Sequence, residues 1–133
     1  MRFITIAILS AAAIWPAAAD AQPADWSHAQ TVNVELSSFK FTPSALSFTR
    51  GVPYRLHLTN TSSGGHDFAA KELFAASTID PQDAASLKDG KVALKSGQSA
   101  DIRLIANTAG SYPIRCTHFM HSSFGMTGTA TVR

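Results

Sequence analysis

The chain has 133 residues, of which 45% are hydrophobic and 15% are charged, and its formal net charge is +2. This length and composition suit one globular domain with an ordinary hydrophobic core. The small net charge, carried by lysines and arginines scattered along the chain, argues against nucleic acid as a partner.

The N-terminus carries the pattern of an export signal. Arg2 precedes an apolar run from residue 3 to residue 14, and Ala19 and Ala21 stand at the small-residue positions that a signal peptidase requires. An uncleaved membrane anchor is the weaker alternative, because the run is shorter than the roughly 20 residues of a membrane span. We therefore expect cleavage after Ala21 and a soluble periplasmic protein without a membrane span.

The remaining chain predicts a short tail at residues 22–30 and one all-β domain at residues 31–133. Short runs rich in Val, Thr, Phe and Tyr alternate with Gly, Pro, Ser and Asn, which is typical of a β-sandwich or barrel. The predicted strands cover residues 31–36, 39–41, 45–49, 54–60, 91–94, 100–106, 111–116 and 127–132.

Residues 69–90 are less strand-like. Asp80 is a plausible helix N-cap, Pro81 suits the first helical position and Gly90 suits a stop. We expect a short helical or irregular excursion here, between two strands.

Strict alternation along residues 54–60 places Tyr54, Leu56 and Leu58 on one face. His57 then lies on the outward face, where we expect it to be solvated. Alternation along residues 111–116 likewise predicts that Cys116 lies at a strand end and points toward the interior.

Cys116 is the only cysteine, which is unusual for an exported protein, because cysteines in an oxidising compartment usually form pairs. A lone thiol there needs burial or a partner that holds its sulfur. The loop after Cys116 has the spacing Cys116-x4-His121-x4-Met126, and His66 follows a Gly-Gly loop earlier in the chain. Two histidines, one cysteine and a weak axial methionine form the ligand set of a blue-copper electron-transfer site.

Two other sites suit these residues less well. Structural zinc usually takes four cysteine or histidine ligands, and methionine is a poor ligand for it. A cysteine protease would need an orienting Asn or Asp and an oxyanion site, and a methionine beside the nucleophile would obstruct the substrate.

Residues 64–68 (GGHDF) and 112–128 (YPIRCTHFMHSSFGMTG) resemble the cupredoxins, which are small exported blue-copper proteins. The resemblance implies a Greek-key β-sandwich of about eight strands with one copper ion at one end. It also implies that His66 is the early histidine ligand, Cys116 the thiolate, His121 the second histidine and Met126 the axial thioether.

Three residues around this motif depart from the usual pattern or add to it. Many cupredoxins have Asn directly after the early histidine, where it braces the cysteine loop; here the residue is Asp67, whose charge would favour Cu(II). His118 and Met120 are extra candidate donors, and we favour His121 over His118 as the ligand.

This site favours a one-electron carrier that works with redox protein partners as a monomer, and we expect no catalysis because nothing suggests an open coordination position. Phe119, Met120 and Phe124 could form an apolar docking patch around His121. The alternative is a periplasmic protein that stores copper or delivers it to copper-trafficking partners, with His118, Met120, His121 and Met126 as an accessible transfer set.

Overall fold

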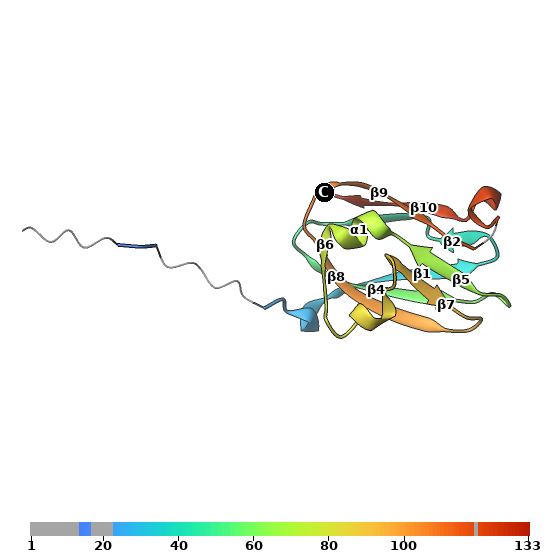
Figure 1. Ribbon diagram of the computed structural model, residues 1–133, viewed down its shortest axis with the longest axis horizontal. Coiled ribbons are helices and arrows are strands. Elements are labelled where there is room, and N and C mark those ends of the chain that lie inside the picture. The colour runs from blue at the N-terminus through green and yellow to red at the C-terminus, as the bar shows by residue number, and fades with distance from the viewer. Residues whose placement is uncertain (1–13, 17–22, 119) are drawn as a thin grey trace, which may run out of the picture.

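The computed structural model describes residues 14–16, 23–118 and 120–133. In this part of the chain ten strands form two five-stranded sheets packed face to face (Figure 1). The strands are β1 (Gln30–Ser37), β2 (Lys40–Thr42), β3 (Ala45–Phe48), β4 (Pro53–Asn60), β5 (His66–Ala69), β6 (Ser77–Ile79), β7 (Lys91–Leu94), β8 (Ser99–Ala106), β9 (Gly110–Arg115) and β10 (Thr127–Val132). The helical segments are η1 (Trp26–His28), α1 (Lys71–Ala75), η2 (Ala84–Ser86) and η3 (Ser122–Phe124).

The order of strands is β2-β1-β4-β8-β6 in one sheet and β3-β10-β9-β5-β7 in the other. Two pairs are parallel, β1 with β4 and β3 with β10, and the other pairs are antiparallel. The predicted all-β sandwich is therefore confirmed.

The structure contains two strands, β5 and β6, that the sequence analysis did not identify. β5 begins with His66 and Asp67, whose polarity hides the strand pattern, but its backbone pairs with β7 along its whole length. β6 pairs with β8 at the edge of the other sheet. Tertiary pairing, rather than local propensity, makes both segments strands.

The helical excursion predicted at residues 69–90 is present, but its main helix lies earlier than expected. α1 occupies residues 71–75, whereas Asp80 does not cap an α-helix. One Asp80 side-chain oxygen instead accepts the N–H of Gln82 at 3.0 Å, which closes a turn. Gly90 adopts φ +73° in the turn that leads into β7.

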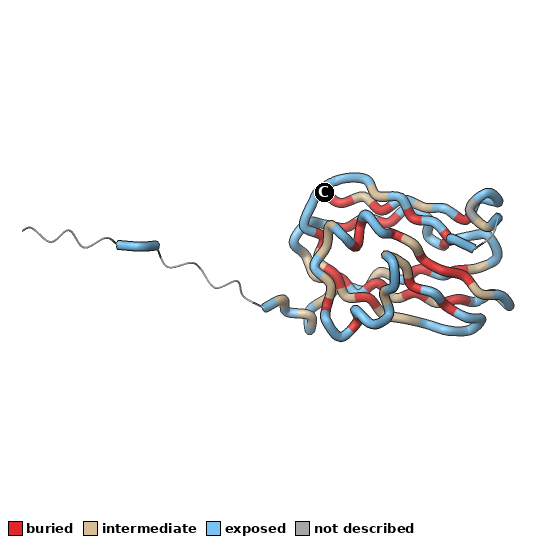
Figure 2. Tube along the Cα trace, viewed as in Figure 1, coloured by how far each residue is buried: buried red, intermediate tan, exposed pale blue. Residues whose placement is uncertain are grey.

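The core lies between the two sheets, and Figure 2 shows buried positions along the strands of both layers. Tyr54, Leu56 and Leu58 on β4 are all buried, as the alternation predicted. Ile102 and Leu104 on the neighbouring strand β8 are completely buried beside them. This packing fixes the strand ends from which the loops project.

The loop between β9 and β10, which contains η3, lies at the end of the sandwich opposite the C-terminus (Figure 1). η1 and the start of β1 lie at the same end as the C-terminus. The predicted export signal falls almost entirely outside the described residues. Within the described residues, the structure contains no helix that is both long and apolar enough to cross a membrane.

Candidate metal centre

Two neighbouring strands and one loop bring three of the predicted donors together. His66 is the first residue of β5, and Cys116 directly follows β9, which pairs with β5. The Cys116 Sγ lies 3.3 Å from His121 Nδ1 and 3.9 Å from His66 Nδ1, and the two Nδ1 atoms are 3.1 Å apart. These three residues form a group whose ligand atoms all lie within 4.8 Å of one another.

Burial shapes the protonation of these donors in the metal-free chain. Burial raises the pKa of the Cys116 thiol, although hydrogen bonds from the backbone N–H groups of Asp67 and His118 partly oppose the shift. Burial also lowers the pKa of His66, and the neighbouring His121 and His118 lower it further. The pocket therefore favours a neutral His66 imidazole, which is the form that binds metals.

Backbone hydrogen bonds close the loop that carries the other donors. The N–H of Cys116 donates to the carbonyl of Met126 at 3.1 Å, and the N–H of Met126 donates to the carbonyl of His121 at 3.0 Å. Met126 is completely buried. The three predicted donors of the loop are thus tied to one another through the main chain.

Asp67 braces the cysteine end of this loop. Its N–H points at the Cys116 sulfur, with a nitrogen-to-sulfur distance of 3.5 Å. Its carboxylate accepts the Thr117 N–H at 2.7 Å and the Thr117 hydroxyl as well. Asp67 therefore occupies the place beside the cysteine loop that the sequence comparison with Asn suggested.

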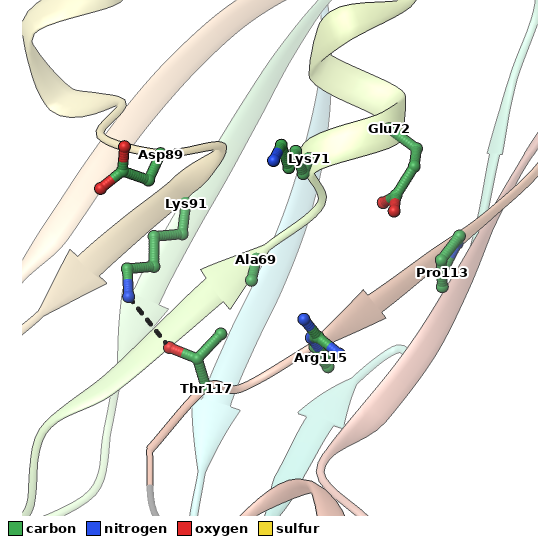
Figure 3. Close-up of a pocket in the computed structure, with 8 residues that line it drawn as sticks. All are labelled: Ala69, Lys71, Glu72, Asp89, Lys91, Pro113, Arg115 and Thr117. Atoms are coloured by element: carbon green, nitrogen blue, oxygen red, sulfur yellow. Dashed lines mark hydrogen bonds between the residues drawn. The ribbon is translucent and has the colours of Figure 1, made fainter.

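Lys91 is a further residue near the site, which the sequence did not single out. Its Nζ lies 3.2 Å from the Thr117 hydroxyl and 4.0 Å from the Asp67 carboxylate. Figure 3 shows Lys91 pointing toward Thr117 in a pocket of about 190 Å³, which Arg115 and Lys71 also line. Lys91 thus places a positive charge next to the buried carboxylate.

An apolar surface lies beside the partly exposed ring of His121. Phe39 packs edge-on against this ring, with centroids 5.0 Å apart, and Phe124 lies 5.3 Å from Phe39. Phe39, Met120 and Phe124 are 42%, 45% and 61% exposed. We call these three residues the apolar patch; Phe119, also predicted here, lies outside the described residues.

Phe39 was missed by the sequence analysis. It occupies the turn between β1 and β2 with φ 58°, a conformation that bulky residues rarely adopt. A phenylalanine in a turn that favours Gly, Asn or Asp is the sequence signal that could have identified it. The ring therefore remains exposed beside His121 although the backbone of this turn is unfavourable for phenylalanine.

Two other histidines do not reach the centre. His57 lies on the outward face of β4 as predicted, and its Nδ1 is 2.6 Å from the Asp101 carboxylate. His28 belongs to η1, where it contacts Asp25.

The donor chemistry fits copper. A buried cysteine sulfur and two histidine Nδ1 atoms converge, and the same loop carries a buried methionine. Thiolate, imidazole and thioether together suit copper, whereas a structural zinc site would need a fourth cysteine or histidine. His118 is not a member of the converging group.

Comparison with known proteins gives one family and many structural matches. A family model described as a cupredoxin-like domain matches residues 5–132. The fold is similar to the reduced auracyanin of Roseiflexus castenholzii, with 19% identity, a TM-score of 0.60, and coverage of 79% of this chain and 98% of that one. Auracyanin B is similar at 23% identity and TM-score 0.60, over 79% of this chain and 89% of that one.

A larger protein shares the fold over part of its length. The McoA multicopper oxidase of Aquifex aeolicus matches at 13% identity and TM-score 0.64, over 86% of this chain but only 32% of the oxidase. No curated protein matches the chain by sequence.

Proposed function

Because the chain belongs to the cupredoxin-like domain family, we propose that it is a periplasmic one-electron carrier that holds a single copper ion. The ligands in this proposal are His66, Cys116, His121 and Met126. The observation that carries it is the convergence of the Cys116 sulfur and the two histidine Nδ1 atoms at one end of the sandwich.

Bound copper would supply the electron by alternating between Cu(I) and Cu(II). The protein's part is to hold the donors still. The Asp67 N–H holds the Cys116 sulfur, and the backbone bonds among Cys116, His121 and Met126 fix the loop. Donors held in this way move little when the charge of the site changes, so the reorganisation barrier is low.

The apolar patch supplies a surface for redox partners. Phe39 packs against His121, the one proposed histidine ligand that reaches the surface, and Phe124 packs against Phe39. Transient electron-transfer contacts need close approach rather than a large interface. A partner that covers the patch would therefore lie next to the ring of His121, a proposed ligand.

The proposal includes electron transfer rather than catalysis. The chain aligns with about a third of the multicopper oxidase, so the likeness to that enzyme extends over one domain-sized part. We also propose export, cleavage after Ala21 and a monomeric state. Mass spectrometry of the protein from a periplasmic fraction should give a chain that begins at Gln22.

One visible spectrum tests the function. The purified protein loaded with Cu(II) should show an intense band from charge transfer between the Cys116 thiolate and copper, and the band should disappear and return on reduction and reoxidation. Cys116→Ser should abolish it. A protein that binds only Cu(I), stays colourless and passes the metal to an acceptor would instead support copper storage or delivery.

Storage or delivery remains the second candidate because of one observation. His118 is 42% exposed at its side chain and lies beside the converging donors, where it could contact incoming or outgoing metal. The reversible redox cycle of the band decides between the two functions.

A further inference from the structure

A hollow of about 380 Å³ opens over the converging donors. His66, His118 and His121 all line it, and of the two proposed ligands among them His66 is buried and His121 is partly exposed. The rest of the lining is the β1–β2 turn and the loop before β5, namely Ser38, Phe39, Ser62, Ser63, Gly64 and Gly65. The hollow is therefore a route by which an ion from solvent can reach two of the proposed ligands.

His118 stands beside this route with its ring stacked on His121. The two ring centroids are 5.3 Å apart with an interplanar angle of 21°, and the ring of His66 lies 6.3 Å away. The Nε2 of His118 is 3.8 Å from the Asp67 carboxylate, which is beyond hydrogen-bond distance. Among the described residues, the only polar side-chain contact of the His118 ring is this long ion pair with Asp67, so a metal ion can compete for the ring nitrogens.

The absence of a side chain at Gly65 leaves room for the His118 ring. A Cβ at position 65 would lie 3.3 Å from the His118 Cε1, closer than ordinary van der Waals contact. The backbone of Gly65 does not need the left-handed conformation, so the absence of a side chain matters here for space. A side chain at position 65 would require the His118 ring to shift by a few tenths of an ångström.

Met120, the other extra donor of the loop, is placed differently. It is 45% exposed, and the residues that line the hollow include His118 but not Met120. The structure therefore separates the two candidates that the sequence left open.

We propose that His118 is a capture ligand: it binds copper at the mouth of the hollow and releases it to His66, Cys116 and His121 during loading. This inference rests on the proposed copper site. Because His118 binds copper only on its way into or out of the site, loss of the His118 imidazole should slow copper binding and copper release by the same factor. The copper affinity should be unchanged.

The test measures the rate of copper loading. Metal-free protein is mixed with Cu(II) in a stopped-flow instrument, and growth of the visible band is followed. His118→Phe keeps a ring that can stack on His121 but removes the nitrogens, so it separates ligation from packing. We expect the second-order rate constant to fall about tenfold or more, because the capture step that raises the local copper concentration is lost. The final spectrum should match the wild type.

Release is measured in the reverse direction, as loss of the visible band when an excess of a Cu(II) chelator such as EDTA is added to the copper-loaded protein. His118→Phe should slow release by the same factor as loading. His57→Gln is the matched control, because His57 has a similarly exposed side chain, 35% against 42%, but lies on the outward face of β4. Its rates should equal those of the wild type.

Three results would overturn the inference, and they are distinguishable. Equal loading rates in wild type and His118→Phe would show that His118 takes no part in capture. A lost or shifted band, or a copper affinity lowered tenfold, would make His118 a resident ligand. Absence of the band in the wild type would overturn the proposed copper site itself, and the capture role with it.

Discussion

The carboxylate of Asp67 accepts both the N–H and the hydroxyl of Thr117, the residue that follows the proposed thiolate ligand. Asp67→Asn should keep this brace, because an amide can accept the N–H and donate to the hydroxyl. The negative charge favours Cu(II), so its loss should make reduction more favourable by about 1–3 kcal/mol. The reduction potential should therefore rise by roughly 40–130 mV. A spectroelectrochemical titration measures this, and an unchanged or lower potential would contradict it.

Lys91 should act in the opposite direction. Lys91→Met removes a positive charge that lies 4.0 Å from the Asp67 carboxylate, so the reduction potential should fall. The change should be below about 1 kcal/mol and should weaken with added salt, because the lysine side chain is partly exposed. Arg50→Met removes an exposed charge at the opposite end of the sandwich, where the Arg50 N–H donates to the carbonyl of Arg133, and it should leave the potential unchanged.

The apolar patch gives a prediction about partner contact. Phe124→Asp places a charge on the patch, so two copper-loaded molecules should approach each other less readily through His121. Electron self-exchange, measured from NMR line broadening in mixtures of reduced and oxidised protein, should slow by about tenfold or more at low salt. The reduction potential should change far less than the rate.

Ser47→Asp is the control for the patch. Ser47 is an exposed residue on β3, so the same charge is added at a position outside the patch. Self-exchange that slows equally in both variants would mean that net charge, rather than the patch, governs the contact.

The sequence predicted the strands with clear alternation and the residues that converge at the centre. The β4 alternation of Tyr54, Leu56 and Leu58 is a local pattern, and it correctly gave the buried face. His66, Cys116 and His121 were identified because few other residues carry donor chemistry. Their ligand roles, and that of Met126, stay a prediction.

The sequence did not predict contacts that depend on which segments meet in space. Phe39 reaches His121, and Lys91 reaches Thr117, across long separations that no local pattern records. β5 was missed because its buried polar residues look like a loop until β7 pairs with it. These contacts follow from the strand order, which hydrophobic periodicity does not determine.

An ion pair far from the centre predicts how stability depends on pH. Burial alone would raise the pKa of Asp83, but hydrogen bonds from the Arg103 side chain and N–H outweigh burial and hold this pKa below its usual value of 3.8. The stabilisation is therefore complete at neutral pH and is lost as the pH falls below about 4 toward the folded-state pKa.

Asp83→Asn should reveal this contribution. The free energy of unfolding at pH 7 should fall by about 1–3 kcal/mol, because hydrogen bonds to a charged group are lost. The difference from the wild type should shrink as the pH is lowered below 4. Urea unfolding of the metal-free protein across this range measures both effects. Asp89→Asn, at an exposed position with φ 53° that Asn tolerates, should have little effect.

Gly128 predicts a large loss of stability on a small substitution. A Cβ at this position in β10 would lie 2.5 Å from the carbonyl oxygen of Ser44, next to the point where β3 and β10 pair. Gly128→Ala should therefore lower the free energy of unfolding by about 2 kcal/mol or more.

Gly64→Ala provides the matched comparison, because a Cβ at position 64 would meet nothing within 4 Å. It should be near neutral in the same urea unfolding experiment. Equal effects of the two alanines would show that Gly128 is not needed for the close approach of the strands.

The two ends of the sandwich are occupied by different parts of the chain. The start of β1 and the C-terminal Arg133 lie at one end, and the β9–β10 loop lies at the other (Figure 1). A fusion partner, affinity tag or electrode linker joined after Arg133 would therefore sit at the end of the sandwich opposite the hollow. The geometry makes the domain suitable for oriented attachment to a surface, with His121 and the apolar patch facing the solution.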